Sequence, residues 1–258
     1  QNQIEWKSKE FSTLDCPLKT NMTSLMKTIF ITGSSRGIGL EMAKQSLAAG
    51  DHVLASCRKP QDAVELTELL NRYDRLDILK MDVNSKSSVD HCFGELHAQK
   101  QPIDLLFNNA GIMDWSNIHE VGEDSFEKIY QTNVIGAFNC LRGSLPCLRL
   151  SSNPIVVNLS SRLGSIGLRG ETQLGGAISY QCSKSALNML TRQAALDLKA
   201  LGICVISLSP GWVKTDMGGD KAKYEVQESV HLLSSTIDKV SLKDSGTFIG
   251  EDGLPIPW

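Results

Sequence analysis

Tyr180 and Lys184 are two side chains whose types and spacing suit acid–base chemistry. The stretch that they open has a helical pattern, and residues four apart on a helix share one face and can serve one site. A phenol with a reference pKa of about 10 is a poor acid or base near neutrality, but a neighbouring ammonium favours its phenolate form. We therefore expect Tyr180 to transfer a proton and Lys184 to tune its pKa. The same spacing occurs by chance in many helices, so the pair carries weight only together with other residues.

Ser160 and Ser161 supply hydroxyl groups that can join this chemistry. They follow directly after the apolar run of residues 155–159, which has the composition of a buried strand. Open parallel sheets bind ligands outside the carboxyl ends of their strands, where a hydroxyl can hydrogen-bond a substrate carbonyl. On this reasoning alone either serine can take that position.

A glycine-rich turn at residues 33–39 is a candidate phosphate site. Glycine permits tight turns and close approach of the backbone to a ligand, and a helix start supplies N–H groups and partial positive charge. Gly33, Gly37 and Gly39 are spaced differently from the common dinucleotide fingerprint, and structural turns also use glycine. The position of the turn between a strand-like run and a helical pattern nevertheless favours binding of a dinucleotide pyrophosphate.

The end of the second predicted strand indicates which dinucleotide would bind. A carboxylate there would hold a free ribose 2′-hydroxyl, but the sequence reads Ser56-Cys57-Arg58-Lys59, without an acidic residue. Arg58, Lys59 and Arg36 of the glycine turn are cationic and can hold a 2′-phosphate by charge-assisted hydrogen bonds. We therefore favour NADP(H) over NAD(H). The alternative is that these are ordinary solvated charges beside a strand.

The elements that must position these residues alternate between strands and helices. Helical periodicity extends over residues 37–49 and 125–148. Such alternation predicts right-handed crossovers and a parallel sheet covered on both faces. We expect an α/β fold, a single-domain Rossmann-type doubly wound parallel sheet of about seven strands with helices on both faces. The predicted strands lie at residues 29–32, 53–56, 76–81, 103–107, 155–159, 205–208 and 247–249.

Composition and charge restrict the class of protein. The 258 residues are 41% hydrophobic, which suffices for one domain over residues 26–258 after a polar leader at 1–25 that we expect to be flexible. No apolar run approaches the ~20 residues that cross a bilayer, and the leader lacks the hydrophobic segment of a secretory signal. A net charge of −3 without long charge runs gives no sign of nucleic acid or an anionic membrane as partner. A cytoplasmic location is predicted.

The cysteines and histidines give no sign of a disulfide framework or a metal site. The 7 cysteines are scattered without a C-x-x-C pair, and we expect reduced thiols. Cys182, between Tyr180 and Lys184, is interpreted as a packed small side chain. The 5 histidines show no paired spacing or cluster with carboxylates, so no metal site is predicted.

Together, these motifs resemble those of the short-chain dehydrogenase/reductase family over residues 26–258. The glycine turn is similar to the family's cofactor turn, Asp82-Val83 to its adenine contact, and Asn108-Asn109-Ala110-Gly111 to the motif that closes the fourth strand. Residues 210–215 are similar to the turn that fixes the nicotinamide carboxamide through residues 213 and 215. The resemblance implies a cofactor bound against Gly33, Ser35, Arg36, Gly37, Ile38, Gly39, Arg58, Asp82, Val83, Asn109, Ala110, Gly111, Tyr180, Lys184, Pro210, Gly211, Val213 and Thr215.

The same resemblance assigns the catalytic residues. Asn133 matches the asparagine that holds a water linking the lysine to solvent, and Ser161 matches the serine that orients the substrate, with Ser160 as an alternative. Tyr180 would give a proton to the carbonyl oxygen, while Lys184 would bind the nicotinamide ribose and lower the tyrosine pKa. The segment between Ser161 and Tyr180 is longer than in many members, which places extra residues beside the pocket.

This longer segment, with residues 210–219 and 252–258, is similar to the sniffer-like carbonyl reductases and the bacterial C-factor proteins. The resemblance implies an NADPH-dependent oxidoreductase that reduces the carbonyl of a small aldehyde, ketone or quinone to an alcohol. The alternative is an NADP(H)-binding signalling or sensing protein of the C-factor type with little turnover, against which the four intact catalytic residues argue. A sugar-nucleotide epimerase would need a larger carboxyl-terminal substrate domain. Homodimers and homotetramers through the helices of Asn133 and Tyr180 are common in the family, and the oligomeric state is left open.

Overall fold

One sheet of seven parallel strands forms the centre of the computed structural model, which describes residues 26–170 and 175–258. The strand order is β3-β2-β1-β4-β5-β6-β7. Every strand predicted from the sequence is present, with ends that agree to within two residues. The strands are β1 (Thr28–Thr32), β2 (His52–Cys57), β3 (Leu76–Lys80), β4 (Leu105–Asn108), β5 (Ile155–Leu159), β6 (Cys204–Leu208) and β7 (Phe248–Ile249).

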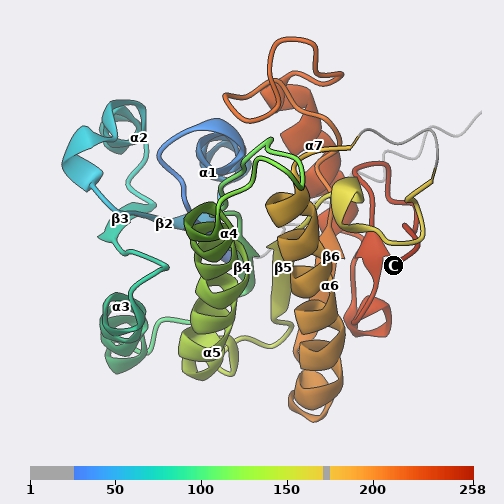
Figure 1. The fold of residues 1–258 in the computed structure, drawn as a ribbon. Coiled ribbons are helices and arrows are strands. Elements are labelled where there is room, and N and C mark those ends of the chain that lie inside the picture. The colour runs from blue at the N-terminus through green and yellow to red at the C-terminus, as the bar shows by residue number, and fades with distance from the viewer. Residues whose placement is uncertain (1–25, 171–174) are drawn as a thin grey trace, which may run out of the picture.

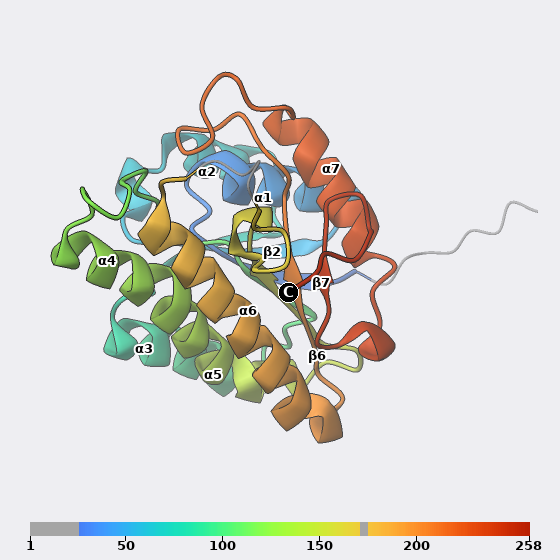
Figure 2. The ribbon, with the colours of Figure 1, turned by 45° about the vertical axis from the view of Figure 1, so that its right-hand side comes forward.

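Helices cover both faces of this sheet (Figure 1 and Figure 2). One face carries α3, α5 and α6, and the other carries α1 and α7, so the predicted doubly wound fold is confirmed. The predicted helix over residues 37–49 is α1. The helices are α1 (Gly37–Ala49), α2 (Val64–Glu68), α3 (Lys86–Ala98), α4 (Glu123–Tyr130), α5 (Ala137–Leu148), α6 (Ile178–Leu198) and α7 (Val226–Ile237).

Strand β1 shows how the sequence builds two cores around one sheet. Successive side chains of a strand point to opposite faces. Ile29 and Ile31 pack in the core under α1 and α7, whereas Phe30 packs in the core under α3 and α5. Both faces are therefore apolar, which explains why this central strand reads as a continuous hydrophobic run rather than an alternating one.

The chain between α4 and α5 differs from the single helix predicted over residues 125–148. Residues Gln131–Gly136 form a π-helical segment that joins the two α-helices. A π-helical turn adds a residue to the helical repeat and is often found at functional sites. It contains Asn133, one of the predicted catalytic residues.

The predicted leader at residues 1–25 lies outside the described residues, as do residues 171–174 of the longer segment before Tyr180. Among the described helices, none is both long and apolar enough to span a bilayer. The described part of the chain holds no group of three metal-binding side chains. Its six cysteines, Cys57, Cys92, Cys140, Cys147, Cys182 and Cys204, are free thiols.

Candidate active site

Tyr180 and Lys184 lie in the first two turns of α6, on its buried side. The start of this helix is held by Ala177, whose N–H donates to the carbonyl of Trp115 at 3.0 Å. Tyr180 is 7% exposed and Lys184 is 5% exposed. The Lys184 Nζ lies 5.5 Å from the centroid of the Tyr180 ring. The structure therefore brings the predicted pair together away from bulk water.

Burial changes the proton affinity of both groups in opposite directions. Burial raises the pKa of Tyr180 to about 12, and a hydrogen bond with Ser161 partly opposes this rise. Burial lowers the pKa of Lys184 to about 8, while its ammonium donates to the Leu159 carbonyl at 2.6 Å. Near neutral pH Tyr180 therefore holds its proton and Lys184 is mostly charged. We predicted from the sequence that Lys184 lowers the Tyr180 pKa. That effect stays a prediction, because burial is the largest cause of the Tyr180 pKa shift and acts in the opposite direction.

The two candidate serines point in different directions after β5. Ser160 is buried, and its hydroxyl donates to Asn188 Oδ1 on α6 at 2.7 Å. The Ser161 hydroxyl accepts the Leu163 N–H at 3.1 Å and makes the hydrogen bond with Tyr180. The geometry therefore brings Ser161 to the phenol and occupies Ser160 elsewhere.

Asn133 is fixed by three hydrogen bonds inside the π-helical segment. Its Nδ2 donates to the Ile112 carbonyl at 2.9 Å and to the Ser183 hydroxyl at 3.0 Å, and its Oδ1 accepts the Ile112 N–H at 2.9 Å. Gly111 lies between this amide and the lysine, because a Cβ there would be 3.3 Å from Asn133 Oδ1 and 3.7 Å from Lys184 Nζ. Asn133, Lys184 and Tyr180 thus belong to one cluster.

The glycine turn after β1 has the shape of a ligand cradle. Gly33 and Gly37 have positive φ angles of +67° and +56°, which side chains other than glycine rarely adopt. A Cβ at Gly39 would lie 2.4 Å from the Gly33 carbonyl oxygen and 2.5 Å from Asn109 Nδ2, so only glycine fits. Ser35 and Ile38 are half-buried in this turn.

The start of α1 fits the phosphates of a dinucleotide. Its N-cap residue Arg36 makes no side-chain capping hydrogen bond, and the first turn carries no acidic residue. The N–H groups of that turn are thus left without a side-chain acceptor, which is the arrangement that anions favour. The ends of β1 and β4 are tied beside the cradle, since Thr32 Oγ1 accepts the N–H groups of Asn109 at 2.9 Å and Ala110 at 3.0 Å.

The three cationic side chains predicted to bind the cofactor phosphate differ in their surroundings. Arg36 forms an exposed ion pair with Asp216 at 2.7 Å, which links the glycine turn to the loop after β6. Arg58 is exposed at the end of β2, and no carboxylate of the described residues forms a salt bridge with it. Lys59 lies 3.6 Å from Asp62. Of the three, Arg58 is the most readily available to a phosphate.

The two residues predicted to contact the adenine, Asp82 and Val83, lie just after β3. The Asp82 N–H donates to Ser88 Oγ at 3.1 Å, and its Oδ1 accepts the Asn84 N–H at 3.0 Å. Val83 packs against Gly136 of the π-helical segment, where a Cβ would lie 3.0 Å from the valine side chain. The loop after β3 therefore contacts the same segment that holds Asn133.

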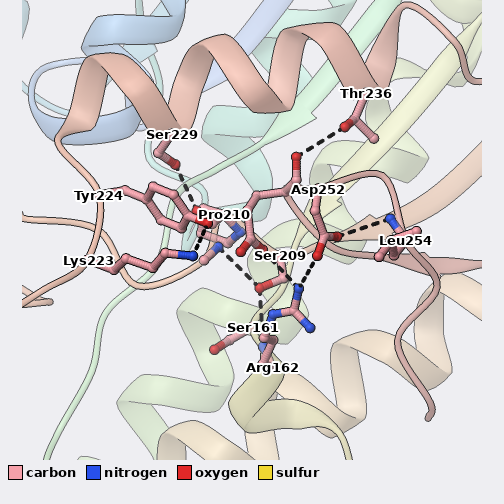
Figure 3. A network of polar contacts seen from close by, with 12 residues as sticks. Ser161, Arg162, Ser209, Pro210, Lys223, Tyr224, Ser229, Thr236, Asp252 and Leu254 are labelled. Carbon is pink, nitrogen blue, oxygen red and sulfur yellow. Dashed lines mark hydrogen bonds and ion pairs between the residues drawn. The ribbon is translucent and has the colours of Figure 1, made fainter.

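The turn at residues 210–215 leaves β6 beside the glycine turn. Gly211 has a φ of +76°, and the Pro210 carbonyl accepts the Ser229 hydroxyl at 2.8 Å (Figure 3). Val213 pairs with Tyr224 in an isolated parallel bridge. A Cβ at Gly37 would lie 3.7 Å from the Thr215 methyl. The two predicted halves of the cofactor site thus face one another.

A cavity of about 440 Å³ opens beside this turn, lined by Trp115, Trp212 and residues 216–221. Trp115 is 59% exposed and Trp212 is 53% exposed, which is unusual for large apolar rings. Sequence reasoning placed the loop at residues 113–121 beside the pocket but did not single out Trp115, because a lone aromatic in an aperiodic loop shows no pattern. It also missed Arg162 and Glu251, although an arginine directly after the candidate serine was a signal.

Comparison with known proteins agrees with this geometry. The family model described as short chain dehydrogenase matches residues 27–225. The chain belongs to the short-chain dehydrogenase family. C-signal of Myxococcus xanthus is 35% identical over 158 residues, which are 61% of this chain and 93% of C-signal.

Two solved structures are similar over nearly all of the described chain. An NADPH-bound carbonyl reductase from chicken fatty liver has a TM-score of 0.85 and 35% identity, covering 90% of this chain and 99% of its own. Carbonyl reductase Sniffer of D. melanogaster has a TM-score of 0.85 and 35% identity, covering 90% of this chain and 100% of its own. The predicted family and its likeness to sniffer-like reductases and C-factor proteins are confirmed, and the chain is an oxidoreductase of the short-chain type.

Proposed function

We propose that this short-chain dehydrogenase reduces the carbonyl of a small aldehyde, ketone or quinone with NADPH. The observation that carries the proposal is a buried phenol that is hydrogen-bonded to Ser161, with the Lys184 Nζ 5.5 Å from its ring centroid. A group that must give a proton to a carbonyl oxygen has to be protonated before the reaction. Tyr180 meets that condition.

The residues of the site divide the work of a reduction. NADPH, when bound, supplies the hydride that reaches the carbonyl carbon. Ser161 and Tyr180 hold the carbonyl oxygen by hydrogen bonds, and the Tyr180 hydroxyl transfers its proton to that oxygen. The phenolate left behind lies next to the Lys184 ammonium, whose charge stabilises it. Asn133 keeps the loop of Ile112 in place beside this cluster.

The preference for NADPH follows from charge at the end of β2. Arg58 is exposed and without a salt bridge to any described carboxylate, and Arg36 lies in the adjacent glycine turn. A 2′-phosphate would give Arg58 an anionic partner and would lie near Arg36, which already pairs with Asp216. The NADPH-bound state of the similar chicken carbonyl reductase supports the same choice. Residues of the glycine turn, the loop after β4 and the turn at 210–215 would hold the rest of the cofactor.

The substrate would enter between Trp115 and Trp212. Trp115 is tied to the start of α6 by its carbonyl, and Trp212 follows Gly211. The Trp212 Nε1 donates to the Gly218 carbonyl at 2.8 Å, which fixes one wall of the cavity. A small molecule with apolar surface fits this setting, since the rings would be covered on binding.

A cofactor-binding protein with little turnover is the second candidate, supported by the 35% identity to C-signal. It predicts NADPH binding without reduction of any carbonyl in a broad panel. The assembled cluster of Asn133, Ser161, Tyr180 and Lys184 favours the enzyme, because a protein that only binds the cofactor does not need a buried proton donor.

Replacement of the phenol tests the proposal. Tyr180→Phe should lower kcat by roughly 100-fold or more, because only the proton donor is removed. The dissociation constant for NADPH, measured by fluorescence titration, should stay within a few-fold of wild type. Tyr130→Phe is the matched control, since Tyr130 lies in α4 and stacks on Phe126, 5.3 Å between ring centroids. Wild-type turnover by Tyr180→Phe would refute the mechanism.

A further inference from the structure

Arg162 follows Ser161 directly and makes two charged contacts beside the site. Its Nη2 lies 3.2 Å from Glu251 Oε2 and 3.2 Å from Asp252 Oδ2 (Figure 3). The Glu251 side chain is 7% exposed, whereas the Arg162 side chain is 40% exposed. A buried carboxylate needs a partner to stay charged. Arg162 therefore anchors the short helical turn 162–164 to the segment after β7.

The backbone around Arg162 is fitted to this contact. A Cβ at Gly250 would lie 2.5 Å from Arg162 Nη2, so a larger residue there would displace the guanidinium from its present position. The Arg162 N–H donates to Ser209 Oγ at 3.3 Å, and the same oxygen accepts the Gly211 N–H at 3.4 Å. The main chain and the side chain of Arg162 are thus held by two different strand ends.

The partner of Arg162 also touches the turn after β6. A Cβ at Gly211 would lie 3.0 Å from the Glu251 carboxyl carbon and 2.7 Å from the Tyr224 ring. Glu251 is therefore packed against the Pro210–Gly211 turn as well as against the guanidinium. The position of Ser161 is linked through this carboxylate to the turn that faces the cofactor cradle.

The segment after β7 makes further contacts with the same loop. The Ser165 hydroxyl donates to the Pro257 carbonyl at 2.5 Å, and the Gly167 N–H donates to the Trp258 carbonyl at 2.6 Å. A three-residue helical turn gains little stability from its own hydrogen bonds. External contacts must set its place: Gly164 accepts hydrogen bonds from Ser185 and Asn188 of α6, and the Arg162 side chain supplies the ion pair to the segment after β7.

We propose that Arg162 is a positioning residue that holds the Ser161 hydroxyl in place for Tyr180 and the substrate through its ion pair with Glu251. The proposal rests on the proposed function. Arg162 does not touch the phenol in this scheme and acts on the reaction only through Ser161. Misplacement of a reacting group by about 1 Å can cost roughly 100-fold in rate, which sets the scale of the expected effect.

The first test separates positioning from stability. Arg162→Met should lower kcat by roughly 10-fold to 100-fold and lower the melting temperature, because Glu251 is left buried without its partner. Arg162→Met/Glu251→Gln removes that unpaired charge. The double variant should recover much of the melting temperature and none of the lost kcat. Recovery of kcat in step with the melting temperature would show a merely structural ion pair and overturn the proposal.

The second test asks whether Arg162 acts through Ser161. In a Ser161→Ala background, Arg162→Met should change kcat by less than about 3-fold, because the hydroxyl that it positions is gone. Arg192→Met is the control, since the Arg192 guanidinium donates to the Gly246 carbonyl at 3.0 Å and does not contact Ser161. The kcat of Arg192→Met should equal that of wild type. Equal losses from Arg162→Met in both backgrounds would overturn the proposal. Full activity of Ser161→Ala alone would instead refute the role of Ser161 in the proposed function.

Discussion

Replacing Lys184 with methionine should change how stability depends on pH. In the folded protein burial lowers the Lys184 pKa from 10.5 to about 8. Between those values the unfolded chain holds a proton that the folded chain has released, so the free energy of unfolding rises with pH in this window. Lys184→Met lacks the group and should lack that rise.

The magnitude follows from the size of the pKa change. One pKa unit corresponds to about 1.4 kcal/mol, so the full penalty of the buried ammonium is about 3 kcal/mol, present below pH ~8 and relieved towards pH ~10.5. Tyr180 has its pKa raised from 10.0 to about 12 and so lowers stability only above pH ~10. From pH ~7 to pH ~10 the wild type should gain about 2.5 kcal/mol relative to Lys184→Met. Loss of the hydrogen bond to Leu159 changes the free energy of unfolding of Lys184→Met by a constant amount. It does not change how the difference in free energy between the two proteins varies with pH.

Urea unfolding at a series of pH values measures this difference directly, with the free energy of unfolding taken by linear extrapolation. Lys199→Met is the control, because Lys199 is exposed at the end of α6, and its curve should run parallel to that of wild type. Parallel curves for wild type and Lys184→Met across the whole range would refute the reasoning, since they would mean that Lys184 does not carry a buried charge.

Two further changes test the cofactor site. Arg58→Ala should weaken NADPH binding by roughly 10-fold to 100-fold, which is the contribution of charged hydrogen bonds to a phosphate. The affinity for NADH should change little. Equal losses of affinity for both cofactors in parallel titrations would mean that the 2′-phosphate binds elsewhere. Gly39→Ala should destabilise the fold by about 1–3 kcal/mol in urea unfolding and weaken NADPH, because its Cβ would overlap the Gly33 carbonyl oxygen. Gly94→Ala in α3, with nothing within 4 Å of its added Cβ, is the matched control; an equal response of the two alanine variants would contradict the cradle geometry.

The sequence was sufficient to predict the sheet and the proximity of several candidate site residues, because both depend on local patterns. Residues 28–32 are buried on both faces and end at a glycine turn. Both features can be recognised from a few consecutive residues of the sequence. The pair Tyr180 and Lys184 is separated by one helical turn, so its proximity follows from helix geometry alone. The family resemblance assigned Ser161, and the physical reason that sets it apart from Ser160 came from the structure, where the Ser160 hydroxyl bonds Asn188 across the core.

Long-range contacts were beyond prediction for a physical reason. Arg162 and Glu251 are 89 positions apart in the chain, and nothing in either neighbourhood signals the other. The π-helical segment at Asn133 was equally hidden, because residues 125–148 have a continuous helical pattern and the extra residue is stabilised by contacts with Ile112 and Ser183 from other elements. Such tertiary contacts override local propensity.

The pKa changes of Tyr180 and Lys184 run in opposite directions and set the protonation of the candidate site. In water a phenol and an ammonium hold protons with nearly equal strength, since their ordinary pKa values are 10.0 and 10.5. In the folded protein Tyr180 binds its proton with a pKa of about 12 and Lys184 with one of about 8. In the proposed reduction the phenolate left on Tyr180 would be a desolvated anion, so its stability would depend on the charge of the Lys184 ammonium beside it. Burial of both groups in one cluster thus keeps the proposed donor protonated and its neighbour mostly charged near neutral pH, which is the state that the proposed reduction needs at its start.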